Sequence, residues 1–326
     1  LNNGNLQNTK IKWFYPISMP PRRLDRMKAI WDKAYQEYFG NGQTSNATES
    51  SAPIQYYFER YATATSLVNV DIGGGTTDIA FANNREINLV TSFRFASNAL
   101  FENQLSNGDR TNGIIDFYKG DILQVLNAKN ISELCDLFNS DNNASPSNMA
   151  SFLFSLKDNK LVKANNIAPS SVDFNHILRY DEKFKIVFIL FYTAIIYHIA
   201  QIIKAKGMET PRHISFSGNG SKVVATITSN LETLSAYTKA IFEHVTEKPY
   251  GKELEILGLG NDSNPKEATC KGGIIGNADN GNDRGKIAVF KGDTSGFVNR
   301  DDTYESVTET YKKNVVKEVE KFFDFA

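Results

Sequence analysis

The stretch that decides the fold is Asp71-Ile72-Gly73-Gly74-Gly75-Thr76-Thr77-Asp78. Apolar runs at 67–72 and 79–82 flank the glycines and predict a strand on each side of them. Three consecutive glycines let the backbone turn tightly and let a ligand approach, because no Cβ stands in the way. Successive exposed N–H groups in such a turn form an anion-binding concavity. We therefore predict a β-hairpin that binds an anion.

A glycine-rich hairpin without a ligand is the simpler alternative, but the residues around the glycines favour binding. Asp71, at the end of the first strand, could orient water around a metal ion held by phosphates. Asp78 could hold the hairpin or a second metal-bound water. Thr76 and Thr77 add hydroxyl donors between the two acids.

A second glycine-rich turn occurs at Gly218-Asn219-Gly220, after a predicted strand at 212–217 and before a predicted helix at 221–240. A helix that starts there leaves free N–H groups and the positive end of its dipole to face an anion or a polar ring. Turns of this kind are common between strands and helices. Taken alone, this one is more simply explained as a structural turn.

The remaining chain alternates between strand and helix patterns, which predicts an α/β fold with layered sheets. Strands are predicted at 12–17, 86–95 and 286–291, and another short apolar stretch occurs at 254–259. Polar loops are predicted at 41–51, 139–148 and 277–285. The turn between the second and third strands is placed at Asn83-Asn84. Helices are predicted at 21–39, 53–63, 113–126, 131–138, 182–205, 265–275 and 304–322.

The apolar segment 186–203 runs for 18 residues without a formal charge, which is at the lower limit for a membrane span. Thr193, His198 and Gln201 give this helix one weakly polar side. A helix that is apolar nearly all round can equally be the central helix of a large core. The core helix is the favoured interpretation.

Composition excludes several classes of protein. The 326 residues are 41% hydrophobic with a net charge of −1, which rules out collagen, coiled coil and general disorder and gives no overall attraction for nucleic acid. The two cysteines are too few for a disulfide framework; two free buried thiols are expected, with a single disulfide as the alternative. The four histidines have no metal-ligand spacing. No signal peptide is visible at the start, and a cytoplasmic location is expected.

Taken in order, these motifs resemble those of the actin-like ATPase superfamily, which includes actin, DnaK-type chaperones, bacterial actins and sugar kinases. D-I-G-G-G-T-T-D is similar to its second phosphate motif, in the form closest to bacterial actins and chaperones. S-G-N-G-S at 217–221 resembles the adenosine motif, although Asn219 interrupts the usual glycine pair. Residues 265–273 are similar to the second connecting helix. Glu49, which lies 22 residues before Asp71, resembles the acid or amide of the first connecting segment.

The resemblance covers about 16–276 and implies an actin-like ATPase (ribonuclease H-like) lobe, with a mixed sheet flanked by helices and an inserted smaller subdomain. Residues 1–65 would be the end of the first lobe with the first connecting segment. Residues 66–95 and 181–276 would form the second-lobe core, 96–180 the insertion and 277–326 a C-terminal extension. The superfamily also has a buried helix before the adenosine-motif strand, so 186–203 is expected in the core.

The resemblance also implies ATP and Mg²⁺ as cofactors, with slow hydrolysis and nucleotide-driven closure of two lobes. The β- and γ-phosphates would contact Gly73, Gly74, Gly75, Thr76 and Thr77. Asp71 would orient magnesium-bound water, and Glu49 would assist the attacking water. Asp78 would be a second acid, which holds the hairpin or a second metal-bound water. The adenosine would lie beside Gly218, Asn219, Gly220 and Ser221.

One element of the superfamily is missing, because no D-x-G hairpin precedes Glu49. A C-terminal fragment of a longer protein is therefore expected, with a degenerate relative as the alternative. As a fragment, the chain alone is expected to bind nucleotide weakly and to be inactive as an ATPase. A non-catalytic interaction or filament module is the rival function, and a kinase of a small metabolite is a third. Self-association or a protein partner stays open, and neither nucleic acid nor a membrane span is expected.

Overall fold

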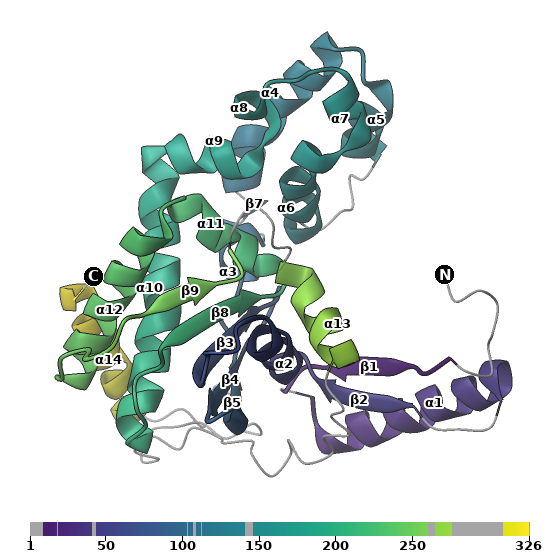
Figure 1. Cartoon of the computed structure of the whole chain (residues 1–326). Helices are drawn as coiled ribbons and strands as arrows, with labels where there is room; N and C mark the ends of the chain where they lie inside the picture. The colour runs from purple at the N-terminus through teal and green to yellow at the C-terminus, as the bar shows by residue number, and fades with distance from the viewer. Residues whose placement is uncertain are drawn as a thin grey trace.

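The computed structural model describes residues 9–17, 19–40, 44–102, 104–106, 109–111, 113–140, 146–259, 265–275 and 309–325 (Figure 1). The loop predicted at 277–285 and the strand predicted at 286–291 lie outside the described residues. The C-terminal extension is described only over α14 (Glu309–Phe325), which includes most of the last predicted helix.

The centre of the molecule is a five-stranded mixed sheet in the order β5-β4-β3-β8-β9. The strands are β3 (Ser66–Ile72), β4 (Thr77–Asn83), β5 (Glu86–Phe93), β8 (His213–Ser217) and β9 (Glu255–Leu257). β4 is antiparallel to β3 and β5, whereas β8 is parallel to β3 and β9. The predicted α/β class is confirmed, and a mixed sheet flanked by helices is consistent with an actin-like ATPase fold.

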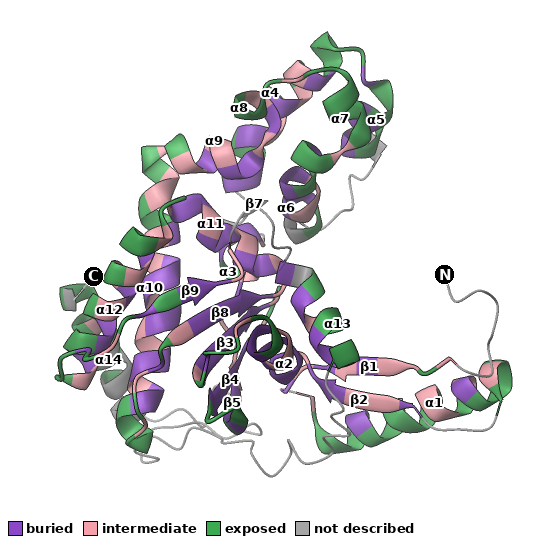
Figure 2. Ribbon diagram, viewed as in Figure 1, coloured by how far each residue is buried: buried purple, intermediate pink, exposed green. Residues whose placement is uncertain are grey.

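The two faces of the sheet belong to different helix layers, because successive side chains of a strand point to opposite sides. Val70, Ile72 and Phe81 belong to the main core, together with α10 (Glu182–Lys206). Leu67 and Ala80 face the other way and join the core of α2 (Ser51–Arg60) and α13 (Pro265–Ile275). The sheet is buried between these layers (Figure 2).

Among the described residues, α10 is long and apolar enough to cross a membrane by length and composition. Of its most apolar 18-residue window, 56% is buried inside the protein. Phe191 contacts Phe95, and Tyr192 contacts Phe216 of β8, with ring centroids 5.1 and 6.0 Å apart. Packing against the sheet therefore accounts for the apolar composition of this helix.

A smaller layer lies beside the main sheet (Figure 1). β1 (Lys12–Tyr15) and β2 (Ser45–Thr48) pair in parallel and pack on α1 (Pro21–Phe39) through Trp13, Tyr15 and Leu24. The loop predicted at 41–51 is therefore wrong over β2. Its sequence, Ser-Asn-Ala-Thr, has no apolar alternation, and only its pairing with β1 makes it a strand.

The segment 96–180 is mainly helical and forms the upper part of the molecule in Figure 1. Its described elements are α3 (Asn98–Phe101), β6 (Gln104–Ser106), β7 (Asp109–Thr111), α4 (Gly113–Ala128), α5 (Ser132–Ser140), α6 (Pro146–Ser155), η2 (Leu156–Asp158), α7 (Lys160–Ala164), α8 (Pro169–Val172) and α9 (Phe174–Tyr180). The polar loop predicted at 139–148 is wrong at both ends, where α5 and α6 extend into it. Its buried residues join the main core, so the domain boundaries stay a prediction.

The helix predicted at 221–240 is instead three shorter elements. They are η3 (Asn219–Val223), α11 (Val224–Ile227) and α12 (Leu231–Thr246). The break has a local cause, because the side chain of Asn230 accepts hydrogen bonds from the N–H groups of Glu232 and Thr233. An Asn at this position starts a new helix by satisfying its first free donors.

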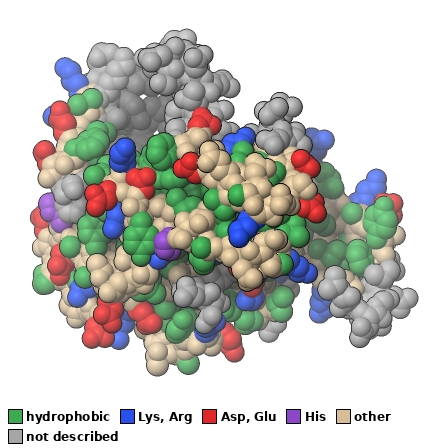
Figure 3. Space-filling view, turned by 90° about the horizontal axis from the view of Figure 1, so that it is seen from above, with side chains coloured by type: hydrophobic (Ala, Val, Ile, Leu, Met, Phe, Trp, Pro, Cys, Tyr) green, Lys and Arg blue, Asp and Glu red, His purple; other side chains and the backbone are tan. Residues whose placement is uncertain are grey.

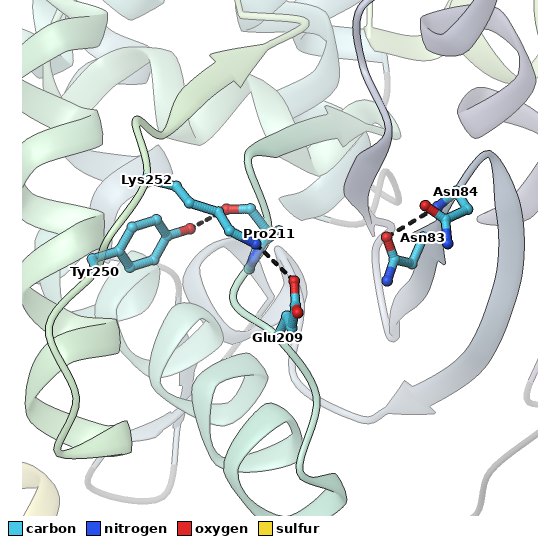
Figure 4. Close-up of polar contacts among 6 residues, drawn as sticks. All are labelled: Asn83, Asn84, Glu209, Pro211, Tyr250 and Lys252. Carbon is cyan, nitrogen blue, oxygen red and sulfur yellow. Dashed lines mark hydrogen bonds and ion pairs between the residues drawn. The ribbon is translucent and has the colours of Figure 1, made fainter.

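Polar contacts fix two connections at the rim of the sheet (Figure 4). The hydroxyl of Tyr250 donates to the carbonyl of Pro211, just before β8, and Lys252 pairs with Glu209 at 2.7 Å. In the β4–β5 turn, the N–H of Asn84 donates to the side chain of Asn83. Asn84 and Arg85 have positive φ, so the turn lies one residue later than predicted.

The burial of the two cysteines and the distribution of charged side chains were both expected from composition. Both cysteines are free thiols, but only Cys135 is buried; Cys270 is exposed on α13, so the expectation of two buried thiols is half correct. Basic and acidic side chains are interspersed on the face seen in Figure 3, as the near-zero net charge suggests.

Candidate functional site

The register of the central strands brings the two glycine-rich turns together. Asp71 of β3 pairs with Asp78 of β4 on one side and with Ser217 of β8 on the other. Because β3 and β8 are parallel, the turns that follow them leave the sheet at the same edge. The segments 73–75 and 218–220 are therefore neighbours, although about 145 residues separate them in the chain.

The second turn packs directly on the end of β3. A Cβ on Gly218 would lie 2.5 Å from the carbonyl oxygen of Ile72 and 2.6 Å from Oδ1 of Asp71. One on Gly220 would lie 2.8 Å from the carbonyl oxygens of Ile72 and Gly73. Gly218 also has φ of +79° and ψ of 159°, a region that only glycine adopts readily. Both glycines are needed for packing, whether or not a ligand binds.

The hairpin at 73–76 is held by its carbonyl groups. The carbonyl of Gly73 accepts from the N–H and the hydroxyl of Ser97, at 3.2 and 2.8 Å, and that of Gly74 accepts from the N–H of Asn98 at 2.8 Å. The N–H groups of Gly74 and Gly75 have no partner among the described residues. The hairpin thus presents donors, as an anion site requires.

Gly75 differs from the other glycines of the hairpin. None of the three glycines has positive φ, and Gly74 is exposed as well. A Cβ added to Gly75, however, would have nothing within 4 Å among the described residues, whereas one on Gly74 would lie 2.9 Å from Oδ1 of Asn98. Neither backbone conformation nor packing requires glycine at this position. Close approach of a ligand is a physical reason for glycine here.

Asp71 lies at the base of the hairpin and is 7% exposed. Burial raises its pKa to about 7, the negative charges of Glu49 and Asp78 add to the rise, and a hydrogen bond from the hydroxyl of Ser217 at 2.7 Å opposes it. A carboxyl group whose pKa is raised in this way, near the carboxyl end of the middle strand β3, is a candidate functional group.

A buried polar network holds Asp71 in place. The amide of Asn69 donates to the carbonyl of Ser50 and to the hydroxyl of Ser217, at 3.1 and 3.0 Å. The hydroxyl of Ser215 donates to Asn69 at 2.8 Å. Asn69, Ser215 and Ser217 are fully buried, and their direct hydrogen bonds join β3, β8 and the start of α2.

Asp78 has a structural environment. Its carboxylate accepts from the N–H of Ile17 at 2.9 Å and from the hydroxyl of Ser92, and it is 2% exposed. Burial raises the pKa of this carboxyl, while both hydrogen bonds lower it. Of the two roles suggested by sequence, these contacts favour a structural one: Asp78 ties the segment after β1 to the central sheet.

Glu49 lies immediately before the Ser50 N-cap of α2 and is half-buried. Burial raises the pKa of its carboxyl, and the charge of Asp78 adds to the rise. The hydroxyl of Ser50 is buried and has no hydrogen-bond partner among the described residues. The charges of Glu49 and Asp78 thus act on Asp71, and the charge of Asp78 acts on Glu49.

A cavity of about 180 Å³ lies beside the hairpin. It is bounded by Gly74, by residues at the start of α3, by α6 and by the second turn; its lining is Gly74, Ser97, Asn98, Phe101, Asn148, Ala150, Ser151, Phe154, Asn219, Gly220 and Val223. The amide of Asn219 donates to the hydroxyl of Ser151 on α6 at 2.9 Å, which connects the second turn to the 96–180 segment.

Two predicted site residues use their hydroxyls elsewhere. Thr77 is fully buried and donates to the carbonyl of Phe95 at 2.6 Å. Ser221 is also fully buried and donates to the carbonyl of Ser217. Neither hydroxyl is positioned as a free donor. Thr76 lies half-buried on the hairpin, and its carbonyl accepts from the N–H of Gly73 at 3.0 Å.

No three His, Cys, Asp or Glu side chains converge to hold a metal ion in the part of the chain that the structure describes. Direct coordination by a carboxylate cage is therefore not available there. Contact between Asp71 and a metal through water, as the sequence predicted, needs no such cage.

Sequence reasoning missed several residues of the site. Asn69 and Ser215 could have been noticed, because polar residues at alternate positions of an apolar strand mark a buried polar face. Asn98 and Ser151 carried no such signal. They reach the cavity from segments without a recognisable motif, and only tertiary packing brings them to the hairpin.

No protein-family model matches this chain, and no curated protein matches it in sequence. Among solved structures, it is similar to the ethanolamine utilization protein EutJ from Carboxydothermus hydrogenoformans, with a TM-score of 0.35 and 12% sequence identity. The match covers 82% of this chain and 66% of that chain, so the chain spans just under two thirds of EutJ. This likeness assigns no role to an individual residue of the chain.

Proposed function

We propose that the chain is the nucleotide-binding part of an actin-like ATPase that binds ATP with Mg²⁺ and, in the full-length protein, hydrolyses it slowly. The observation that carries this proposal is Gly75, a glycine with open space around it in a hairpin where the N–H groups of Gly74 and Gly75 have no partner among the described residues. A cytoplasmic location belongs to the same proposal.

The residues present fit a magnesium nucleotide. The hairpin offers N–H donors to phosphate oxygens, and Asp71 lies at its base with a displaced pKa. The adjoining cavity is smaller than the ~300–1,000 Å³ typical of pockets that enclose a whole small ligand. It has room for only part of a nucleotide, and the remainder would lie outside it.

Each group has a separate role in this proposal. The N–H groups of 74–76 hold phosphate oxygens, as exposed backbone amides do. Asp71, once ionised, accepts hydrogen bonds from metal-bound water. Glu49 accepts a proton from the attacking water, and a pKa raised by burial suits that role. When bound, Mg²⁺ neutralises charge on the phosphates and supplies the ordered waters.

Asn219 and Gly220 flank the nucleoside in this proposal, because both line the cavity. Gly218 and Ser221 support them from behind through the packing described above. A nucleotide that contacts the hairpin, the second turn and Glu49 together would draw the segment before α2 toward the sheet. This is the proposed origin of nucleotide-driven lobe closure.

The second candidate is a non-catalytic interaction or filament module with the same fold. Two motif residues favour it. Asp78 accepts a hydrogen bond from the N–H of Ile17, and the buried hydroxyl of Thr77 donates to the carbonyl of Phe95, so both side chains stabilise the fold. Such a module would keep the fold and show no nucleotide-dependent property.

A calorimetric titration of the chain with Mg-ATP tests the proposal. We expect measurable binding by the unchanged chain and at least tenfold weaker binding by Gly75→Ala, whose methyl group would stand where phosphate approaches. Gly251→Ala is the matched control, because Gly251 is also exposed with nothing within 4 Å of an added Cβ. No heat with the unchanged chain at millimolar Mg-ATP would contradict the proposal and favour the scaffold.

A further inference from the structure

The cavity beside the hairpin has a distinctive chemistry. Its polar lining residues are serines and asparagines, and its apolar ones include Phe101 and Phe154; none of the described lining residues carries a charge. A phosphate group buried there would have no cationic partner. The cavity is therefore suited to an uncharged group that makes hydrogen bonds and also packs on apolar surface.

Asn98 supplies the most specific feature of this cavity. Its Oδ1 is buried and has no hydrogen-bond partner among the described residues. This oxygen lies 2.9 Å from where a Cβ on Gly74 would be, so it stands directly beside the hairpin. The backbone of Asn98 is anchored there by its N–H bond to the carbonyl of Gly74.

A buried acceptor without a partner is unfavourable, and native structures rarely keep one unless something completes it. The side chain of Asn98 lines the cavity, so a ligand group there lies beside its amide, and a small rotation of the amide would turn Oδ1 toward that group. That group has to be a donor, because a carbonyl oxygen repels the oxygens of a phosphate.

The sugar of a nucleotide is a candidate for the group that donates to Asn98, because it follows the phosphates along the nucleotide. If the phosphates occupy the N–H groups at 74–76, the next group along the nucleotide is the sugar. The cavity adjoins the hairpin at Gly74, and its volume of about 180 Å³ suits a single ring better than a complete nucleoside. A sugar also matches its walls, because it is uncharged and carries hydroxyl donors.

We propose that this cavity holds the ribose of the bound nucleotide and that Asn98 Oδ1 accepts a hydrogen bond from a ribose hydroxyl. This inference rests on the proposed function. It makes Asn98 a specificity-determining residue that favours ribonucleotides over deoxyribonucleotides. A deoxynucleotide that lacks this hydroxyl would leave Oδ1 of Asn98 buried and unpaired. A site distinguishes a ligand from its deoxy analogue best when the analogue leaves a buried polar group without a partner.

The test measures the binding of three magnesium nucleotides to the full chain: ATP, 2′-deoxy-ATP and 3′-deoxy-ATP. We expect at least one deoxy analogue to bind roughly 3- to 10-fold more weakly than ATP, the range of one neutral hydrogen bond. Asn98→Leu has similar size and no acceptor. It should weaken ATP binding by the same factor, leave binding of that deoxy analogue unchanged, and abolish the discrimination.

Ser151→Ala is the matched cavity control, because it changes a lining residue on α6 without removing the acceptor. It should affect all three nucleotides by the same factor. Circular dichroism establishes that each variant is folded, and the comparison of analogues on the unchanged chain stands even if Asn98→Leu fails to fold.

The outcomes separate this inference from the proposed function. Equal binding of ATP and both analogues by the unchanged chain would overturn the role of Asn98 and leave nucleotide binding intact. Equal weakening of all three nucleotides by Asn98→Leu would assign the side chain to the phosphates and also overturn it. If no nucleotide binds, the proposed function fails first.

Discussion

Gly218 and Gly75 both lie in glycine-rich turns that follow strands of the central sheet, but their surroundings are opposite. Around Gly218, backbone and side-chain atoms of β3 would lie within 2.6 Å of an added Cβ. Around Gly75 there is open space. The two turns look alike in sequence, yet the first of these glycines is needed to fold and the second is available for a ligand.

The largest effect is expected at the packed turn. Gly218→Ala should lower the free energy of unfolding by roughly 2–4 kcal/mol, because strained backbone and close contact with Ile72 add together. Denaturant unfolding measures this. Gly40→Ala is the matched control, since Gly40 has a similar backbone conformation (φ 94°, ψ −158°) with nothing within 4 Å of its Cβ position. Equal losses at both positions would mean that packing at Gly218 adds nothing.

Asp71, between the two turns, should make stability depend on pH. Its pKa is raised to about 7 from 3.8 in the folded chain, so its ionisation favours unfolding. Its stabilising contribution is complete below about pH 4 and is lost as pH rises through 7. Without nucleotide, Asp71→Asn should gain roughly 1–3 kcal/mol relative to the unchanged chain between pH 5 and pH 8. Thermal unfolding at both pH values checks this, and parallel pH profiles would contradict it.

A smaller effect is expected where the packed turn meets α6. Ser151→Ala removes the acceptor for Asn219 and should lower stability by about 0.5–1.5 kcal/mol, the net contribution of a hydrogen bond. Ser155→Ala is the control on the same helix, because the hydroxyl of Ser155 is exposed and bonds only within the helix, to Phe152. A double-mutant cycle with Asn219→Ala isolates the pair, and a coupling energy of zero would show that this contact does not join the two segments.

The smallest effect on stability is expected at the open turn. Gly75→Ala should change the free energy of unfolding by no more than about 0.5 kcal/mol, because the added methyl group meets nothing. The same denaturant titration measures it. A loss above about 2 kcal/mol would show that Gly75 is structural, and the contrast between the two turns would disappear.

Much of the central architecture was readable from local pattern. The strands around the hairpin, the long helix α10 and its end at Gly207 follow from apolar runs and from glycine at a left-handed position. β2 was not readable, because its four residues are polar or small and become a strand only beside β1. The break before α12 was overlooked, although Asn230 is a typical helix start.

The sequence by itself determined that an acidic strand end, three glycines and a second glycine-rich turn occur in this order, because each depends on residues adjacent in the chain. Tertiary structure decided what those residues can do. Whether a glycine is surrounded, whether Asp71 is buried near Glu49 and whether Asn98 faces a cavity all depend on segments tens to hundreds of residues apart. Burial, electrostatic coupling and steric contact act through space, so only the folded chain assigns one turn to packing and leaves the other open to a ligand.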